Sequence, residues 1–474
     1  LTPFHEATDA GPFQNWPLGK GFDRFYGFME GYTDQYTPDL VKDNERIRAP
    51  KTPEEGYHLS EDLAEQAIRL VNRQHMVYPD NPFFLYFALG AGHAPHQAPK
   101  EYIDHYKGAF DAGWDEIREQ WFANQKRIGI VPENTVLNPR NEFVKPWNEL
   151  TDDEKKVYAR YMEVYAGFLE HADAQIGKVV DYLKEIGEFE NTVIVLLSDN
   201  GASAEGGKNG RVNQEKSLNL LEETNNVELT LKHLEELGSS AYSNPHYPVG
   251  WANAGNTPFQ WYKSWVHSGG VKDPLIVSYP KGIHAKGEIR NQYLHVIDIA
   301  PTILDILGVD KPDHIKGIAQ KPYHGASFAG TFDDAEAPDV RHIQYYEQTG
   351  NRGIWKDGWK AITNHIYDKD YINETWELYH VAEDFSESEN VAEQYPDKLK
   401  ELIALWYVQA GKYGVLPLGD GPYLTQKPEE LLNVVKENKF YIEPQKFSYR
   451  GVLHPLDITT KTMFNRRNHK ITVQ

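Results

Sequence analysis

Apolar positions at helical spacing and unbroken apolar runs follow one another through the first part of the chain. A stripe of small and apolar side chains predicts a helix over residues 59–75, with Ser60 as its N-cap. The run that comes next predicts a buried strand over 83–89, which ends in small residues and two histidines. Helix and strand in succession are typical of α/β units.

A second helix and strand repeat this order. Thr151 and Glu154 match a capping box, and apolar residues at helical spacing continue until Gly187. The stretch "TVIVLLSDNG" (192–201) begins with a run of Val, Ile and Leu that predicts a strand buried on both faces, and 273–280 contains another such run. The alternation predicts an α/β fold whose central, largely parallel sheet is flanked by helices.

The pattern changes after residue 340. A strand at 342–348, the segments "RGIWKDGWKAI" and "TWELYHV", and a helix at 395–413 predict a smaller α+β subdomain with an antiparallel sheet. We therefore divide the chain into an α/β core (1–340), this subdomain (341–414) and an extension (415–474) with few core signals.

Other stretches are less regular. Residues 1–56 are rich in loops, and 100–150 is predicted to be helical but irregular and to lie on the surface. A long polar excursion over 201–257, with a helix near 226–237, is expected to shape the mouth of a pocket, because loops on a rigid sheet usually carry specificity. A further helix is predicted at 296–309.

The composition indicates a folded protein and narrows its partners. The 474 residues are 13% aromatic, and the net charge of −21 argues against nucleic acid or an anionic membrane surface as a general partner. No apolar stretch is long enough to cross a bilayer. The chain has no cysteine, which excludes disulfides, a thiolate zinc site and a thiol nucleophile within it and leaves its compartment open.

Asp199 and Asn200 directly follow the first strand-forming run of the second unit. Ligands of open α/β sheets bind beyond the carboxyl ends of the strands. The oxygen donors of Asp and Asn suit a divalent cation such as calcium or magnesium. A simple turn explains the same two residues, because Asp, Asn and Gly are common turn formers.

His93 follows one predicted strand and Lys263 precedes another. Taken singly, they have ordinary interpretations, a hydrogen-bonded loop histidine and a solvated lysine. At the same sheet edge as Asp199 and Asn200, they would add donors for an anion beside a cation site. That arrangement suits phosphoryl or sulfuryl transfer.

Several segments together resemble a known family. "FALGAGHAPHQAPKEYIDHYKG", "NTVIVLLSDNGA", "TPFQWYKSWVHSGGVKDPLIVSYP" and "GNRGIWKDGWKAI" are similar, in this order, to segments of the sulfatases of the alkaline phosphatase superfamily, most closely to bacterial arylsulfatases. The resemblance runs nearly from end to end. It implies that His93 and Lys263 contact the sulfate and that Asp199 and Asn200 are calcium ligands.

The resemblance also implies an activity. The complete enzyme would cleave sulfate monoesters of a small molecule or a sulfated glycan, using calcium and a formylglycine nucleophile. His93 would act on the leaving-group side as hydrogen-bond donor or general acid, and Lys263 would neutralise sulfate charge.

The sequence departs from the family's pattern upstream. The Asp-Asp pair of the metal site, the C-x-P-x-R or S-x-P-x-R segment that gives formylglycine, and G-K-W-H do not occur before the matched segments. "LTPFHEATDAGPF" resembles the family's segment directly after G-K-W-H, and the final residues resemble the lead into a further β-sandwich. We therefore expect a chain cut at the N-terminus, and also at the C-terminus, that is inactive by itself.

Two other functions stay open from the residues. The same metal clamp would serve a phosphodiesterase or phosphonate hydrolase of the superfamily. A non-catalytic module could bind sulfated glycans through His93, Lys263 and aromatic loops. Substrate, localisation and oligomeric state are not predicted.

Overall fold

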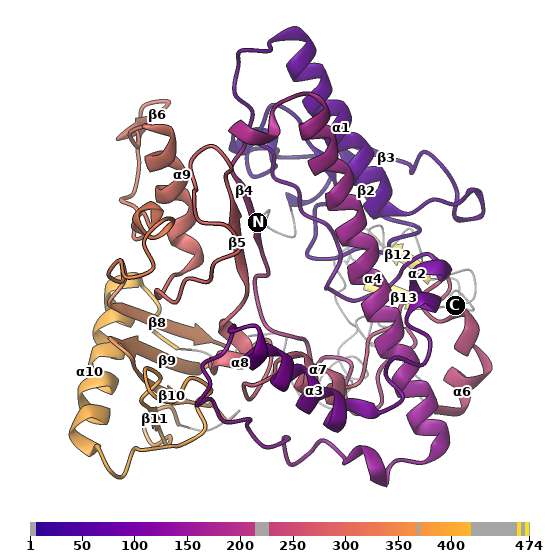
Figure 1. Ribbon diagram of the computed structural model, residues 1–474. Coiled ribbons are helices and arrows are strands. Elements are labelled where there is room, and N and C mark those ends of the chain that lie inside the picture. The colour runs from indigo at the N-terminus through magenta and orange to yellow at the C-terminus, as the bar shows by residue number, and fades with distance from the viewer. Residues whose placement is uncertain (1–5, 214–226, 367–369, 419–461, 466–469, 474) are drawn as a thin grey trace.

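The structure is a computed structural model that describes residues 6–213, 227–366, 370–418, 462–465 and 470–473. Helices surround several small sheets, and the C-terminal sheet with its helix lies at one side of the molecule (Figure 1). The predicted α/β class, with a smaller α+β part after it, is confirmed. None of the described helices is both long enough and apolar enough to cross a membrane.

The N-terminal part is more ordered than its loop-rich sequence predicts. β1 (Tyr26–Gly27), β2 (Leu40–Lys42) and β3 (Glu45–Ile47) pair as an antiparallel sheet. Helix α1 (Leu59–Val77) follows, and its N-cap is His58 rather than the predicted Ser60, because His58 Nδ1 accepts a hydrogen bond from the Ser60 backbone.

Helix α4 (Asp152–Glu185) matches its prediction most closely. Thr151 Oγ1 accepts from the Glu154 backbone N–H, and the Glu154 carboxylate accepts from the Thr151 N–H, so the predicted capping box is confirmed. α1 packs along α4 (Figure 1), which buries the apolar stripe of α1.

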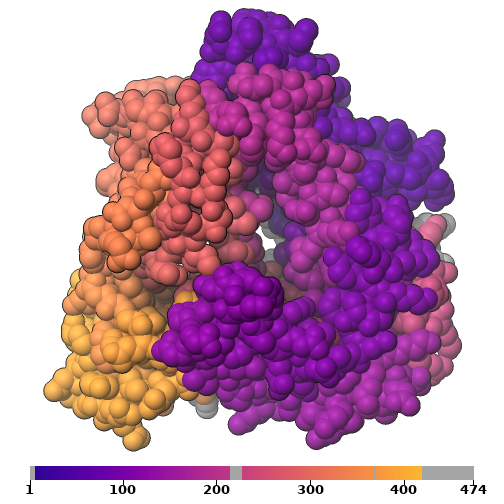
Figure 2. Space-filling model, in the orientation of Figure 1, coloured from indigo at the N-terminus to yellow at the C-terminus, as the bar shows by residue number. Residues whose placement is uncertain are grey.

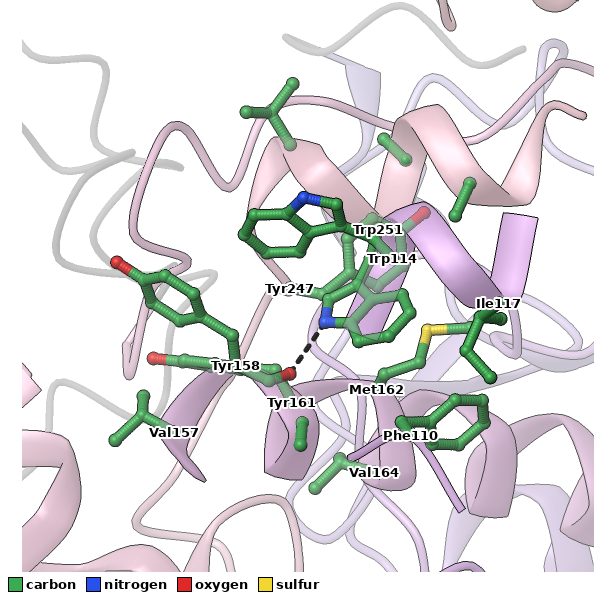
Figure 3. Packing of buried hydrophobic residues seen from close by; sticks show 14 of the residues in the cluster. Phe110, Trp114, Ile117, Val157, Tyr158, Tyr161, Met162, Val164, Tyr247 and Trp251 are labelled. Atoms are coloured by element: carbon green, nitrogen blue, oxygen red, sulfur yellow. Dashed lines mark hydrogen bonds between the residues drawn. The ribbon is translucent and has the colours of Figure 1, made fainter. Parts of the chain in front are cut away.

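The segment 100–150 forms α2 (Lys100–His105), α3 (Gly113–Arg127) and the 3-10 turn η4 (Trp147–Glu149). The prediction that it lies on the surface is wrong, because its aromatic side chains enter the largest core beside α4. Figure 3 shows Trp114 against Trp251, whose indole N–H donates to the Tyr158 carbonyl (2.7 Å). Aromatic packing of this kind needs few regular elements, which explains why periodicity missed it.

β4 (Ile194–Leu197) and β5 (Leu275–Ser278) pair antiparallel, with Leu197 opposite Leu275. The expected parallel direction is therefore wrong for this pair, since an apolar run shows that a strand forms but not which way its partner runs. The segment 83–89 is not assigned as a strand.

The remaining elements of the core connect these parts. They are η2 (Leu18–Lys20), η3 (Pro53–Glu55), η5 (Phe189–Asn191), α6 (Val227–Lys232), η6 (Leu234–Glu236), α7 (Val249–Gly255), α8 (Ser268–Val271), η7 (Val296–Asp298), α9 (Ile299–Leu307), β6 (His314–Ile315), β7 (Ile318–Ala319) and η8 (Ala329–Thr331). Part of the excursion over 201–257 lies outside the described residues.

The elements of the C-terminal part are β8 (Ile343–Gln348), β9 (Asn351–Lys356), β10 (Trp359–Thr363), β11 (Glu377–Tyr379), α10 (Pro396–Tyr413), and the separate pair β12 (Thr462–Asn465) and β13 (Lys470–Val473). The C-terminal sheet has the order β11-β10-β9-β8 and is antiparallel, as predicted. Helix α10 packs on it through a small core of its own. Most of the extension lies outside the described residues.

Candidate functional site

The loop after β4 carries the two predicted metal ligands. Asp199 is exposed and Asn200 is partly buried, and Asn200 Nδ2 donates to the Gly201 carbonyl (3.0 Å). A Cβ added at Gly201 would lie 1.8 Å from the carbonyl oxygen of Gly269. Only glycine permits this approach of two backbones, so the end of β4 lies directly against the segment that precedes β5.

Hydrogen bonds hold the same loop to the segment that carries Lys263. The Lys263 backbone N–H donates to the Ala202 carbonyl (3.0 Å). Asn256 joins both sides, because its Oδ1 accepts from the Ala202 N–H and its Nδ2 donates to the Trp261 carbonyl (2.8 Å each). The backbone of Lys263 is therefore fixed relative to the end of β4.

A buried network holds the loop of His93. The Gln97 side chain accepts from the Gln35 N–H (2.8 Å) and donates to Asp34 Oδ2 (2.8 Å) and to the Ser243 carbonyl (2.9 Å). Gln97 is fully buried. One amide thus joins three loops that are distant in sequence and fixes the end of the loop that carries His93.

His93 and Lys263 are in direct contact. Lys263 Nζ lies 3.1 Å from His93 Nε2, and His93 Nδ1 lies 2.7 Å from the Ala94 carbonyl oxygen. Since a carbonyl only accepts, Nδ1 carries the hydrogen and Nε2 accepts from the Lys263 ammonium. Burial, and then the charge of Lys263, lower the pKa of His93 and keep its imidazole neutral. Tyr32 stacks on this ring, with centroids 5.5 Å apart.

A carboxylate that the sequence did not predict completes the cluster. Glu205 Oε2 lies 3.5 Å from Lys263 Nζ, and the two side chains are 37% and 21% exposed. The Glu205 N–H donates to Ser203 Oγ (3.2 Å). A Cβ at Gly206 would lie 2.0 Å from the Tyr247 carbonyl oxygen, so close packing fixes the backbone on the other side of Glu205.

The predicted calcium site has donors of the right type but too few of them. Asn200 Oδ1 and the Asp199 carboxylate are hard oxygen donors, whereas calcium takes about six to eight. Across the described residues, no group of three or more His, Cys, Asp or Glu side chains could hold a metal ion. Asp273 lies next to Asp199, and burial followed by the charge of Asp199 raises the pKa of Asp273 to about 7.

Three loops thus bring His93, Lys263 and Glu205 together, as the sequence predicted for the first two. Burial and the charge of Lys263 lower the pKa of His93, and the charge of Asp199 is close enough to offset this lowering in part. Asn200 adjoins Asp199 in the chain. Sequence reasoning missed Glu205 because it stands in a glycine-rich loop without periodicity, where the position of a side chain depends on turns.

Comparison with known proteins identifies the family of the chain. The family model described as "Sulfatase" matches residues 4–309, and "N-sulphoglucosamine sulphohydrolase, C-terminal" matches 258–405. An uncharacterized sulfatase of Schizosaccharomyces pombe is 35% identical over 429 residues, which are 89% of this chain and 74% of that protein. An arylsulfatase of Klebsiella aerogenes is 31% identical over 65% of this chain and 64% of its own length.

Solved structures show the same fold. Ps i-CgsB in complex with k-i-k-neocarrahexaose aligns with a TM-score of 0.52 at 18% identity, over 89% of this chain and 72% of that chain. A protein in complex with its substrate D-glucosamine-2-N,6-O-disulfate aligns with a TM-score of 0.50 at 19% identity, over 84% and 77%. With the Sulfatase model matching more than half of its residues, the chain belongs to the sulfatase family.

Proposed function

We propose that the protein to which this chain belongs hydrolyses sulfate monoesters, and that His93 and Lys263 bind the sulfate ester. The observation that carries this proposal is the 3.1 Å contact between Lys263 Nζ and His93 Nε2 beside the end of β4. In a sulfatase-family chain, a cation and a neutral imidazole at this edge match the charge of a sulfate ester and the needs of its leaving group.

The two side chains have different parts in this proposal. Lys263 binds a sulfate oxygen through its ammonium. With its Nδ1 hydrogen engaged by Ala94, His93 presents Nε2 to the ester. As the ester oxygen gains negative charge and leaves, it takes up a proton from the Lys263 ammonium by way of Nε2, and Lys263 is left as a neutral amine. His93 is then a relay rather than an acid that is charged beforehand.

The finer parts of the mechanism are also proposals. Asp199 and Asn200 Oδ1 would hold a calcium ion, which when bound supplies positive charge that polarises a sulfate oxygen. The remaining ligands would be water or polypeptide outside the described residues. Neither C-x-P-x-R nor S-x-P-x-R occurs in the 474 residues, so we place the formylglycine in polypeptide outside them and expect no turnover from this chain alone.

The names of two relatives suggest the substrate class. One relative is named arylsulfatase, and another, 27% identical over 52% of this chain, is the N-acetylglucosamine-6-O-sulfatase of Bacteroides thetaiotaomicron. We propose an aryl or a carbohydrate sulfate, with the described part of 201–257 beside the pocket mouth.

The test compares substrates and variants of the full-length protein with calcium present. Hydrolysis of p-nitrophenyl sulfate and N-acetylglucosamine-6-sulfate should exceed that of bis-p-nitrophenyl phosphate. Lys263→Ala should lower kcat/KM by about 100-fold or more, the order lost when one charge-stabilising donor is removed. Lys208→Ala, which removes an exposed lysine of the loop that carries Glu205, is the matched control. Preference for the phosphodiester, or full activity of Lys263→Ala, would reject the proposal.

A further inference from the structure

We propose that Glu205 positions Lys263 and makes the His93–Lys263 pair select singly charged sulfate esters over doubly charged phosphate monoesters. This inference rests on the proposed function, because it concerns the anion that the pair binds. It assigns a role to a residue that neither the sequence pattern nor the family resemblance singled out.

Glu205 first determines where the Lys263 hydrogens point. A lysine ammonium has three N–H donors. One is directed at His93 Nε2, 3.1 Å away, and the Glu205 carboxylate at 3.5 Å attracts a second. The third is left for a substrate oxygen. Without Glu205, the flexible lysine stem would sample other orientations, and the donor would lose its fixed direction.

Glu205 also determines the charge that the incoming anion meets. Lys263 is positive, Glu205 is negative, and burial keeps His93 neutral, so these three side chains sum to about zero before substrate binds. A sulfate monoester brings one negative charge. A phosphate monoester brings nearly two above its second pKa, which is near 6, and the second charge faces the Glu205 carboxylate.

The size of this effect follows from Coulomb's law. One additional charge about 6–7 Å from a partly buried carboxylate corresponds to roughly a tenfold difference in affinity at an effective dielectric constant of about 40. A cation at Asp199 and Asn200 would strengthen the binding of both anions, and more so that of the doubly charged one, so the effect of Glu205 is the change in the ratio of the two affinities when its charge is removed.

The carboxylate can be neutralised without disturbing the loop. Ser203 Oγ and the close contact between Gly206 and Tyr247 hold the backbone independently of the Glu205 side chain. Glu205→Gln therefore removes the charge at nearly constant shape, and Glu205→Asp keeps the charge. Glu228→Gln is the matched control, because Glu228 accepts a hydrogen bond from Lys232 (2.8 Å) and forms with it an exposed Glu–Lys pair on α6.

The experiment measures binding of two non-hydrolysable probes by calorimetry at about pH 8.5, where benzylsulfonate carries one charge and benzylphosphonate nearly two. Glu205→Gln should raise the affinity for benzylphosphonate about tenfold more than that for benzylsulfonate. Glu205→Asp and Glu228→Gln should leave the ratio of the two affinities as in the unchanged protein.

An unchanged ratio in Glu205→Gln would overturn the inference. If that variant does not fold, Glu205→Ala makes the same test, because it also removes the carboxylate, and an unchanged ratio in Glu205→Ala would likewise overturn the inference. Lys263→Ala separates the two proposals. If Lys263→Ala binds both probes normally, the proposed function fails. If it weakens both while Glu205→Gln leaves the ratio unchanged, only the role of Glu205 fails.

Discussion

The C-terminal sheet and the β4–β5 pair both contain strands that the sequence predicted, but they differ in how far their apolar side chains are covered. In the C-terminal sheet, Ile354 of β9 and Ala361 of β10 are fully buried, and Trp406 of α10 covers them at 0% exposure. The β4–β5 pair has no such cover. Leu196 and Leu197 are 42% and 40% exposed, although neighbouring residues of a strand point to opposite faces.

The difference shows that an apolar run in the sequence predicts a strand but does not show whether the rest of the chain buries the side chains of that strand. Ile276 of β5 is 58% exposed, and Phe84 and Tyr86 of the segment 83–89, which forms no strand, are 68% and 74% exposed. Figure 2 shows an opening through the middle of the face on which the salmon and magenta parts meet. These side chains thus stay partly open to solvent, whereas those of the C-terminal sheet are covered.

The largest effect on stability is expected in the C-terminal sheet, which α10 covers. Trp406→Ala removes a fully buried indole from the contact of α10 with β9 and should lower the free energy of unfolding by about 3–5 kcal/mol. Urea unfolding followed by fluorescence measures it. A loss below about 1 kcal/mol would mean that α10 does not close this sheet.

A slightly smaller loss of stability is expected where the C-terminal sheet contacts the segment next to the candidate site. Lys360 of β10 donates to the buried Glu387 (2.6 Å), which also accepts from Ser268 beside the Lys263 segment. Lys360→Met leaves Glu387 buried without its cation and should cost about 3 kcal/mol. Restored stability in the Lys360→Met, Glu387→Gln double variant would attribute the loss to the unpaired charge. Failure to restore it would point to packing instead.

The α1–α4 side of the core should be sensitive to acid. Burial, and next the neighbouring His171, lower the pKa of His58 to about 3. The unfolded chain protonates this imidazole near pH 6.5. Between these two values the unfolded state binds the extra proton, so the free energy of unfolding falls by about 1.4 kcal/mol for each pH unit lowered.

His58→Asn keeps an N-cap acceptor for α1 and removes this titration. The slope of unfolding free energy against pH, measured by urea unfolding between about pH 4 and 6, should become smaller by that amount. The exposed His314→Gln serves as control. An unchanged slope in His58→Asn would show that His58 is not the group responsible.

The smallest effect on stability is expected in the β4–β5 pair, whose apolar side chains are partly exposed. Leu197→Ala removes a side chain that is 40% exposed on β4 and should cost less than about 1 kcal/mol. The same urea measurement applies. A cost equal to that of Trp406→Ala would mean that β4 is as well covered in solution as the C-terminal sheet, and the comparison would fail.

Sequence reasoning succeeded where the signal is local. The capping box of Thr151 and Glu154 and the antiparallel pairing of β9 with β10 depend on residues close in sequence. The antiparallel direction of β5 and the burial of Trp114 depend on partners distant in sequence, which periodicity does not encode. At the site, His93 and Lys263 were found through the family resemblance, whereas Glu205 owes its place to the course of one loop.

The most direct test of the central claim is a crystal structure of the protein with benzylsulfonate, which resembles a sulfate ester and is not hydrolysed. We predict sulfonate oxygens within hydrogen-bonding distance of Lys263 Nζ, with the benzyl group on the side of His93 Nε2. Benzylsulfonate bound elsewhere, for instance in the cavity lined by Tyr279, Phe332 and Asp333, with the His93–Lys263 contact intact, would contradict the proposed function.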